Sequence, residues 1–141
     1  MGRTDCKSEL MKRFLRPTKV SPAACGQPHG LVHGGVFKRL VIGAQVGADP
    51  SGEVPEGFEA QAELAFDNML AVIDAAQLAA GDLTRLAAYV ATPGCFAQYN
   101  LVRERKMGSA TPVSTYVETA GLGDPRWLIS IEGEAIREPD L

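Results

Sequence analysis

The sequence has few cysteines and little net charge, and each shortage excludes a class of protein. Cys6, Cys25 and Cys95 lie far apart, which fits neither a disulfide framework nor closely spaced zinc ligands. The net charge is only −3 at pH 7, with acidic and basic residues interspersed. No broad basic face is therefore available to a phosphate backbone. We predict reduced thiols and no nucleic acid as a partner.

Long hydrophobic runs and nucleotide-binding motifs are also absent. No apolar run approaches the roughly 20 residues that a membrane-spanning helix needs, and the N-terminus lacks the apolar core of a secretory signal. Neither Gly-x-x-x-x-Gly-Lys nor Gly-x-Gly-x-x-Gly occurs, so no phosphate-binding loop is indicated. We expect a cytoplasmic protein with no membrane partner, no cofactor and no metal.

The length and the apolar content predict one domain with an N-terminal extension. The chain has 141 residues, of which 45% are hydrophobic, enough for one core and too little for two ordinary domains. Residues 1–30 combine several basic side chains with Pro17, Pro22 and Pro28, a pattern typical of an extended or mobile arm. We therefore assign 1–30 to an arm and 31–141 to a single domain.

Hydrophobic periodicity then predicts the elements of that domain. An apolar, β-branched run at 40–42 indicates a buried strand, and the glycines before it suggest a hairpin or a bulge with 31–37. Apolar residues three and four apart predict an amphipathic helix over 58–80 and a shorter one over 96–108. Alternation predicts strands at 84–91, 113–119 and 127–136, the last two joined through 121–125 as an antiparallel hairpin.

This order of elements favours an α+β fold, in which both helices pack on one face of a mixed sheet. The late strands carry apolar residues in both phases of the alternation: Val117, Ile129 and Ile131 in one, Tyr116, Leu128 and Ile136 in the other. Leaving such a second face in water would forfeit several kcal/mol at about 25 cal/mol per Å². We therefore expect another subunit to cover it.

Several stretches, in this order and spacing, resemble the YjgF or reactive-intermediate-deaminase (Rid) family, once labelled translation inhibitors or endoribonucleases. They span 32–137: Gln45-Val46-Gly47-Ala48-Asp49-Pro50-Ser51-Gly52, then Gln61 with Ala65-Phe66-Asp67-Asn68-Met69 and Val72, then Phe96-Ala97-Gln98-Tyr99-Asn100, Pro112, Leu122 and Ile129-Ser130-Ile131-Glu132. The resemblance implies a chorismate-mutase-like fold. It also implies a homotrimer whose sheets line a central barrel, with a small-molecule cleft at each subunit junction.

The resemblance further implies chemistry, and here the sequence departs from the family pattern. Archetypal members hydrolyse imines and enamines of 2-amino acids, holding the substrate carboxylate with an Arg and handling a water with a carboxylate. Those positions fall on Ser114 and Ser130, and a further family serine falls on Gly43; Asn100 is retained. We expect this divergent member to lack the archetypal 2-aminoacrylate activity, because serine supplies neither the charge nor the paired donors of guanidinium.

The alternation of side chains along the two late strands predicts a polar pocket. Ser114, Tyr116 and Glu118 share one face of their strand, and Ser130, Glu132 and Glu134 share one face of theirs. If those faces meet at a subunit junction, Glu132 is the candidate general base. It remains open whether Glu132 is instead an interface carboxylate with a hydrogen-bond partner.

Four other side chains are candidates for the pocket. His33 precedes the first buried strand, near the place where relatives carry a Tyr or His at the cleft mouth, and either lines the pocket or bonds to backbone. Arg103, Arg105 and Arg126 are candidate anchors for an anion, with hydration at the surface as the alternative. The leading hypothesis is a Rid-like hydrolase or deaminase of a small imine, enamine or related metabolite. The alternative is a non-catalytic trimer that binds a metabolite or regulates a partner.

Overall fold

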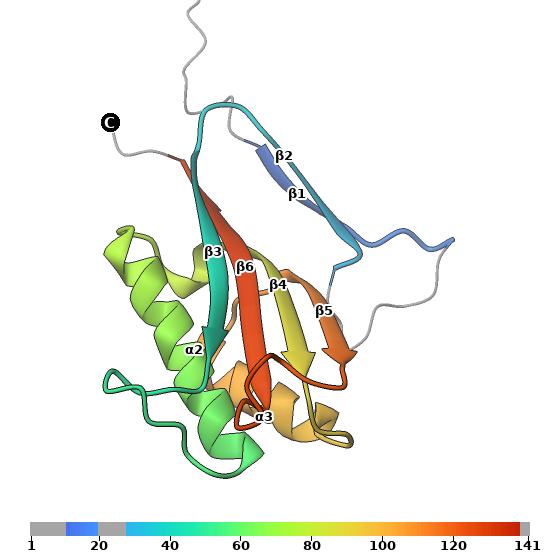
Figure 1. The fold of residues 1–141 in the computed structure, drawn as a ribbon. Helices are drawn as coiled ribbons and strands as arrows, with labels where there is room; N and C mark the ends of the chain where they lie inside the picture. Colours follow the sequence, from blue (N-terminus) through green and yellow to red (C-terminus); the bar gives the residue numbers. More distant parts are fainter. Residues whose placement is uncertain (1–10, 20–27, 139–141) are drawn as a thin grey trace, which may run out of the picture.

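Two helices pack against one face of a four-stranded sheet, as Figure 1 shows for the computed structural model of the chain. The structure describes residues 11–19 and 28–138. The sheet contains β3 (Lys38–Val46), β4 (Leu83–Val90), β5 (Val113–Glu118) and β6 (Ile129–Arg137), and the helices are α2 (Phe58–Ala75) and α3 (Phe96–Met107). A single 3-10 turn, η2 (Ala80–Asp82), precedes β4. This arrangement confirms the predicted α+β fold with both helices on one face.

Helix α2 forms where the apolar spacing predicted it and buries one side against the sheet. Its fully buried residues, Ala62, Ala65, Phe66, Met69 and Ile73, recur at three- and four-residue steps. The helix ends at Ala75, earlier than the predicted residue 80. The reason lies at Gln77, whose φ of 61° turns the chain out of the helical path.

Two polar side chains of α2 fix the loops around it. Asn68 donates its side-chain amide to the carbonyl oxygens of Val46 and Ala48, both at 2.9 Å. The Gln61 side chain is buried, donates to the carbonyl oxygens of Pro55 and Arg126, and accepts a hydrogen bond from the Leu128 amide at 2.8 Å. The chain entering α2 and the chain entering β6 are therefore held to the same helix.

The strand order is β3-β6-β4-β5, which overturns the predicted hairpin through 121–125. Strand β6 lies between β3 and β4 and runs antiparallel to both, while β5 runs parallel to β4. The burial of the two strands explains the order. In β6, Ile129, Ile131 and Ala135 are completely buried, so this strand requires a neighbour on each side, whereas the more exposed β5 occupies an edge.

A separate two-stranded ribbon extends beyond one end of the sheet (Figure 1). It pairs β1 (Met11–Leu15) with β2 (Gly30–Gly34) in antiparallel register. Strand β2 therefore does not form the expected hairpin with β3. A register shift occurs elsewhere, inside β3 between Ile42 and Gln45, where the sequence did not predict it. Strand β1 falls in the predicted arm and was not predicted, because the basic residues and prolines of 1–30 indicated an extended arm. Residues 1–10 and 20–27 of the arm lie outside the described residues.

The two faces of the sheet carry different side chains. The helix-covered face holds Leu86, Ala88 and Val90 of β4. On this face Ala88 is in register with Ile131 of β6 and Tyr116 of β5, and Val90 is in register with Ile129. Val117 lies on the opposite face, in register with Tyr89 and away from Ile129 and Ile131, which corrects the grouping made from the sequence. We call this opposite side the open face.

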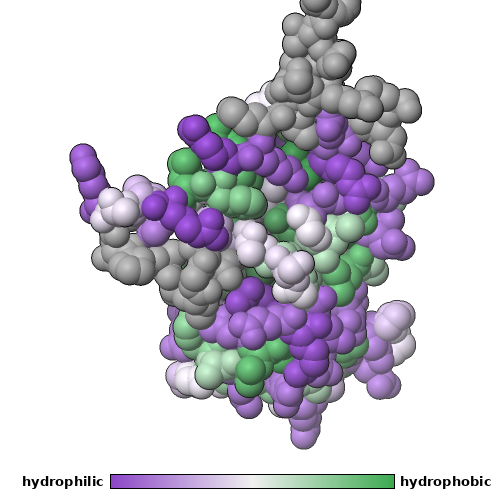
Figure 2. Space-filling view, turned by 180° about the vertical axis from the view of Figure 1, so that it is seen from behind, coloured by the Kyte–Doolittle hydropathy of each residue, from purple (hydrophilic) through white to green (hydrophobic). Residues whose placement is uncertain are grey.

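The open face is less apolar than expected. Val41 is 65% exposed and Val117 is 39% exposed, but charged side chains of β3, β4 and β6 lie between them. The side of the molecule opposite to the view of Figure 1 likewise presents hydrophilic and hydrophobic residues intermixed (Figure 2). Within the described residues, no helix is long and apolar enough to cross a membrane.

The close approach of β6 and β4 gives the first prediction. A Cβ at Gly133 would overlap the carbonyl oxygen of Arg85, whereas a Cβ at Gly43 meets nothing within 4 Å. Gly133→Ala should lower the free energy of unfolding by about 3 kcal/mol or more, through overpacking against rigid backbone. Gly43→Ala, the matched control, should change it by less than about 0.5 kcal/mol. Urea denaturation measures both, and equal effects would contradict the account.

Candidate functional site

The edge strand β5 and helix α3 enclose an aromatic cluster on the helix-covered side. The ring centroid of Tyr116 lies 4.8 Å from that of Phe96 and 5.1 Å from that of Tyr99. We call these three residues the aromatic seam. Two predicted pocket residues adjoin it: Ser114 is two residues before Tyr116 on the same face of β5, and Asn100 is one helical turn after Phe96. Ser114 and Tyr116 therefore share one face of β5, beside the helix that carries Asn100.

Two hydroxyl groups of the seam are buried without partners. The phenol oxygens of Tyr99 and Tyr116 accept and donate no hydrogen bond among the described residues. Burial raises the pKa of Tyr99, and burial with the Glu118 carboxylate and Cys95 raises the pKa of Tyr116. A buried hydroxyl group without a hydrogen-bond partner lowers the stability of the fold by about 1–3 kcal/mol. Two such groups side by side therefore call for an explanation.

The open face carries a charged ladder, which we define as Arg39, Arg85, Glu132 and Glu134. Arg39 donates its Nε to Glu134 at 2.7 Å, and Arg85 donates its Nε to the other Glu134 oxygen at 3.2 Å. The Arg39 guanidinium holds the pKa of Glu134 below its usual value, against burial and with help from Arg85. Arg85 also pairs with Glu132 at 3.6 Å. The candidate base Glu132 is therefore a partly exposed, ion-paired carboxylate.

A pocket of about 250 Å³ lies between the ribbon and this ladder. It is lined by Leu31, His33, Thr84, Arg85, Val113, Glu134 and Ile136. His33 is exposed on β2 and stacks edge-on against Phe37 with ring centroids 4.8 Å apart. Lys12 of β1 donates to the Ile136 carbonyl oxygen and so ties the ribbon to β6. His33 thus adjoins Arg85 and Glu134, and the structure does not bring it to the seam.

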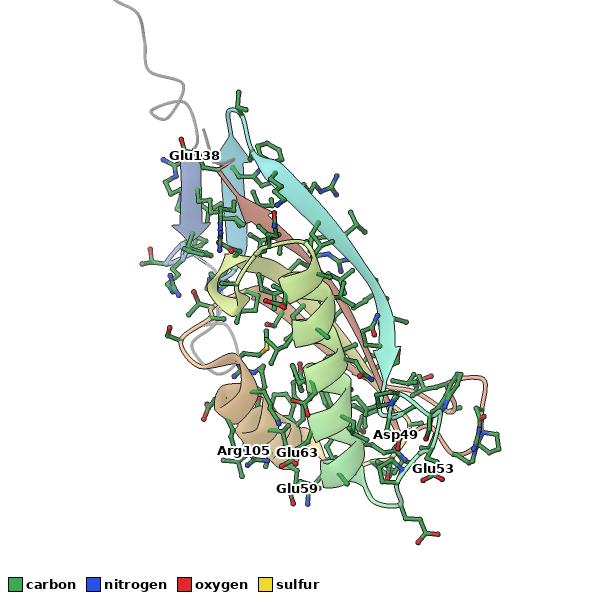
Figure 3. All side chains as sticks on the ribbon, turned by 90° about the vertical axis from the view of Figure 1, so that its left-hand side faces the viewer. Asp49, Glu53, Glu59, Glu63, Arg105 and Glu138 are labelled. Atoms are coloured by element: carbon green, nitrogen blue, oxygen red, sulfur yellow. The ribbon has the colours of Figure 1, made fainter. Side chains whose placement is uncertain are left out.

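Each of the three candidate anchors already has a carboxylate partner. Arg105 pairs with Glu59 and Glu63 of α2, as Figure 3 shows. Arg126 binds Asp124 through two guanidinium nitrogens, and its hydrogen bonds lower the pKa of Asp124 to about 2. Arg103 is buried on α3, with Glu104 at 4.0 Å and further interactions of its own. Arg105 and Arg126 therefore act locally, in helix packing and in a loop.

The predicted pocket residues fall into two groups on opposite faces of the sheet. Ser114 and Tyr116 face the helices, whereas Glu132 and Ser130 face the open side, in register with Ala87 and Tyr89. Ser130 is 9% exposed in this position. Gly43 lies apart from both groups at the bulge of the edge strand β3. One copy of the chain therefore cannot place Ser114 and Glu132 in the same pocket.

Sequence reasoning missed several residues that define these groups. Tyr99 was named only as part of a predicted helix and of the family stretch at 96–100, and its buried hydroxyl group was not anticipated. Arg39 and Arg85 were not nominated at all. The alternation of β4 did place Arg85 opposite Leu86, but strand pairing with β6 was needed to show that Glu132 and Glu134 lie beside it.

The lowered pKa of Glu134 predicts a pH-dependent contribution to stability. A carboxylate whose folded pKa is depressed stabilises the fold above its unfolded pKa of about 4.3, and that stability is lost as pH falls through the folded pKa. Glu134→Gln should lower the free energy of unfolding by about 1 kcal/mol at neutral pH. The difference from wild type should shrink as the pH falls below about 4.3 and through the lowered folded pKa of Glu134. Urea denaturation from neutral into acidic pH, with the exposed Glu56→Gln as control, tests this; a pH-independent difference would refute it.

Comparison with known proteins identifies the family. The model of the family described as Endoribonuclease L-PSP matches residues 22–137, starting inside the predicted arm. The 2-iminobutanoate/2-iminopropanoate deaminase of Escherichia coli K12 is 33% identical over 124 residues, which cover 84% of this chain and 92% of that protein.

Solved structures agree. The Rid-family protein YyfB of Yersinia pestis superposes with a TM-score of 0.76 at 24% identity, covering 88% of this chain and 97% of that one. RidA of the Antarctic bacterium Psychrobacter superposes with a TM-score of 0.66 at 26% identity, covering 87% of this chain and 98% of that one. The resemblance read from the motifs is therefore confirmed, and the chain belongs to the YjgF or Rid family, whose family model is described as Endoribonuclease L-PSP.

Proposed function

We propose that this chain is a homotrimeric hydrolase that deaminates a small imine or enamine at the junctions between its copies. The observation that carries the proposal is the split of the candidate residues between two faces of one sheet. Asn100, Ser114 and Tyr116 border the edge strand β5, and Gly43 lies on the other edge strand, β3. A neighbouring copy that brings its open face to the seam would complete a pocket from both groups.

The name of the Escherichia coli relative supports the type of reaction, because that protein is a deaminase of 2-imino acids. In the proposed reaction, water attacks the carbon of the protonated imine while a carboxylate accepts one proton from the water. The carboxylate then passes that proton to the nitrogen of the neutral carbinolamine, the C–N bond breaks and ammonia leaves. The hydroxyl oxygen becomes the carbonyl oxygen of the product as it releases its own proton. Glu132 is the carboxylate we assign to this step, with Ser130 beside it on β6.

The substrate should differ from that of the relative. Ser114 stands where the family pattern has an Arg for the substrate carboxylate, and Ser130 stands where it has a carboxylate. Loss of one charged hydrogen bond weakens binding by about 1.5 to 3 kcal/mol. An imine that does not depend on a carboxylate for binding therefore suits this pocket better than 2-iminopropanoate does.

One observation favours a second function, a non-catalytic metabolite binder. Arg85 pairs with both Glu132 and Glu134, so the ladder holds its carboxylates in ion pairs within one copy. A paired carboxylate is a weaker base than a free one. A metabolite that raises the melting temperature by mass action yet stays chemically unchanged would select this function.

The role of Glu132 gives the next prediction. Ammonia release from a panel of imines with and without carboxylates should show turnover by the wild type, greatest for the uncharged members. Glu132→Gln keeps the shape but accepts no proton, so it should lower kcat by about 100-fold or more. Circular dichroism checks that the variant folds. Absence of turnover by the wild type, or full turnover by Glu132→Gln, would overturn the assignment and favour the binder.

Subunit mixing tests whether the pocket forms between copies. Asn100→Ala and Glu132→Gln should each be inactive as homotrimers, because each removes one half of every pocket. When the two chains are co-expressed, the mixed trimers should recover about a quarter of wild-type activity. With random assembly, one subunit junction in four combines an intact Asn100 with an intact Glu132. A mixture no more active than its parents would show that both residues serve a pocket within one copy.

A further inference from the structure

Two phenol groups of the aromatic seam are the least explained polar groups in the described chain. Tyr99 is 3% exposed, and its ring contacts that of Tyr116 at a centroid distance of 5.1 Å. Both hydroxyl oxygens are buried and unpaired. Folding has therefore gathered two O–H donors that lack an acceptor, beside two residues of the proposed pocket, Asn100 and Ser114.

Packing holds the two rings in place. Phe66 of α2 contacts Tyr99 from the core side at a centroid distance of 5.8 Å. On the outer side, Phe96 meets Tyr116 edge-on and is itself 40% exposed. Phe96 is therefore the exposed member of the seam, and the two hydroxyl groups are buried within a single copy of the chain. An apolar surface beside unpaired polar groups is the combination found in small-molecule sites.

The charges around the seam decide which polar group fits. The Glu118 carboxylate is close enough to act on Tyr116 and accepts a hydrogen bond from the Gly94 amide at 3.2 Å. Arg103 acts on Tyr99 but is engaged in other interactions. Because burial raises the pKa of both phenols, they remain neutral donors at physiological pH. A carboxylate here would meet Glu118 without a free counter-charge, whereas an uncharged carbonyl oxygen needs only the donors.

We propose that the hydroxyls of Tyr99 and Tyr116 bind an uncharged carbonyl or amide oxygen of the substrate, with its apolar or aromatic part against Phe96. The inference rests on the proposed function and specifies its substrate class: imines that carry an amide or ketone oxygen instead of a carboxylate. The tyrosine pair is a specificity determinant and takes the place of the missing Arg. A purely structural role, in which the hydroxyls bond a buried water, is the competing explanation.

Calorimetric titration of the full chain with benzamide and benzoate tests this, because the two probes share a ring and differ in charge. Benzamide should bind more tightly than benzoate. Tyr99→Phe and Tyr116→Phe remove one oxygen each and keep the rings, so each should weaken benzamide binding by about 3- to 10-fold. Ser51→Ala removes a hydroxyl in the loop between β3 and α2, which contributes to neither wall of the proposed pocket, and is the control for which binding should not change.

The melting temperature distinguishes a binding role from misfolding. Removing a buried, unpaired hydroxyl should leave the melting temperature of each variant equal to or above that of the wild type. Benzoate binding as tightly as benzamide, no binding of either probe, or unchanged benzamide binding by both Phe variants would overturn the inference. If benzamide binding depends on the tyrosines while no imine is hydrolysed, the inference stands and the deaminase proposal fails alone.

Discussion

Strand β6 must have a neighbouring strand along each of its two edges, and most of the structure follows from that requirement. Three of its residues, Ile129, Ile131 and Ala135, are completely buried, so it takes the centre of the sheet between β3 and β4. Gly133 allows the close approach to the Arg85 carbonyl that this position demands. The alternating residues of the same strand, Ser130, Glu132 and Glu134, are thereby committed to the face that the helices leave open.

Two chemically different surfaces result from that commitment. On the open face, the charged ladder satisfies its own members, since Arg39 and Arg85 pair with Glu134 and Arg85 also pairs with Glu132. On the helix-covered face, the aromatic seam leaves two phenol groups unsatisfied. Charged side chains that are already ion-paired can be packed against a neighbouring copy. Hydroxyl donors without an acceptor are better placed where a ligand binds. The proposed pocket takes one wall from each surface.

Membership of the Rid family and departure from its pattern coexist because they concern different residues. The core positions that carry the fold, such as Phe66 and Met69 of α2, are buried as in any close-packed interior. The predicted departures, Gly43, Ser114 and Ser130, lie on the strands that border the proposed pocket. Under the proposed function, they change which ligand is bound while the core of the fold is kept.

The sequence by itself determined the α+β class, the two helices, the four main strands and the family, because periodicity and motif spacing are local properties. It also determined which residues share a face within one strand. Tertiary structure decided which strands are neighbours. It removed the hairpin expected at 121–125, paired β2 with β1, and set Ser114 and Glu132 on opposite faces. Strand order depends on the burial that each strand requires in the assembled sheet, and no single segment carries that information.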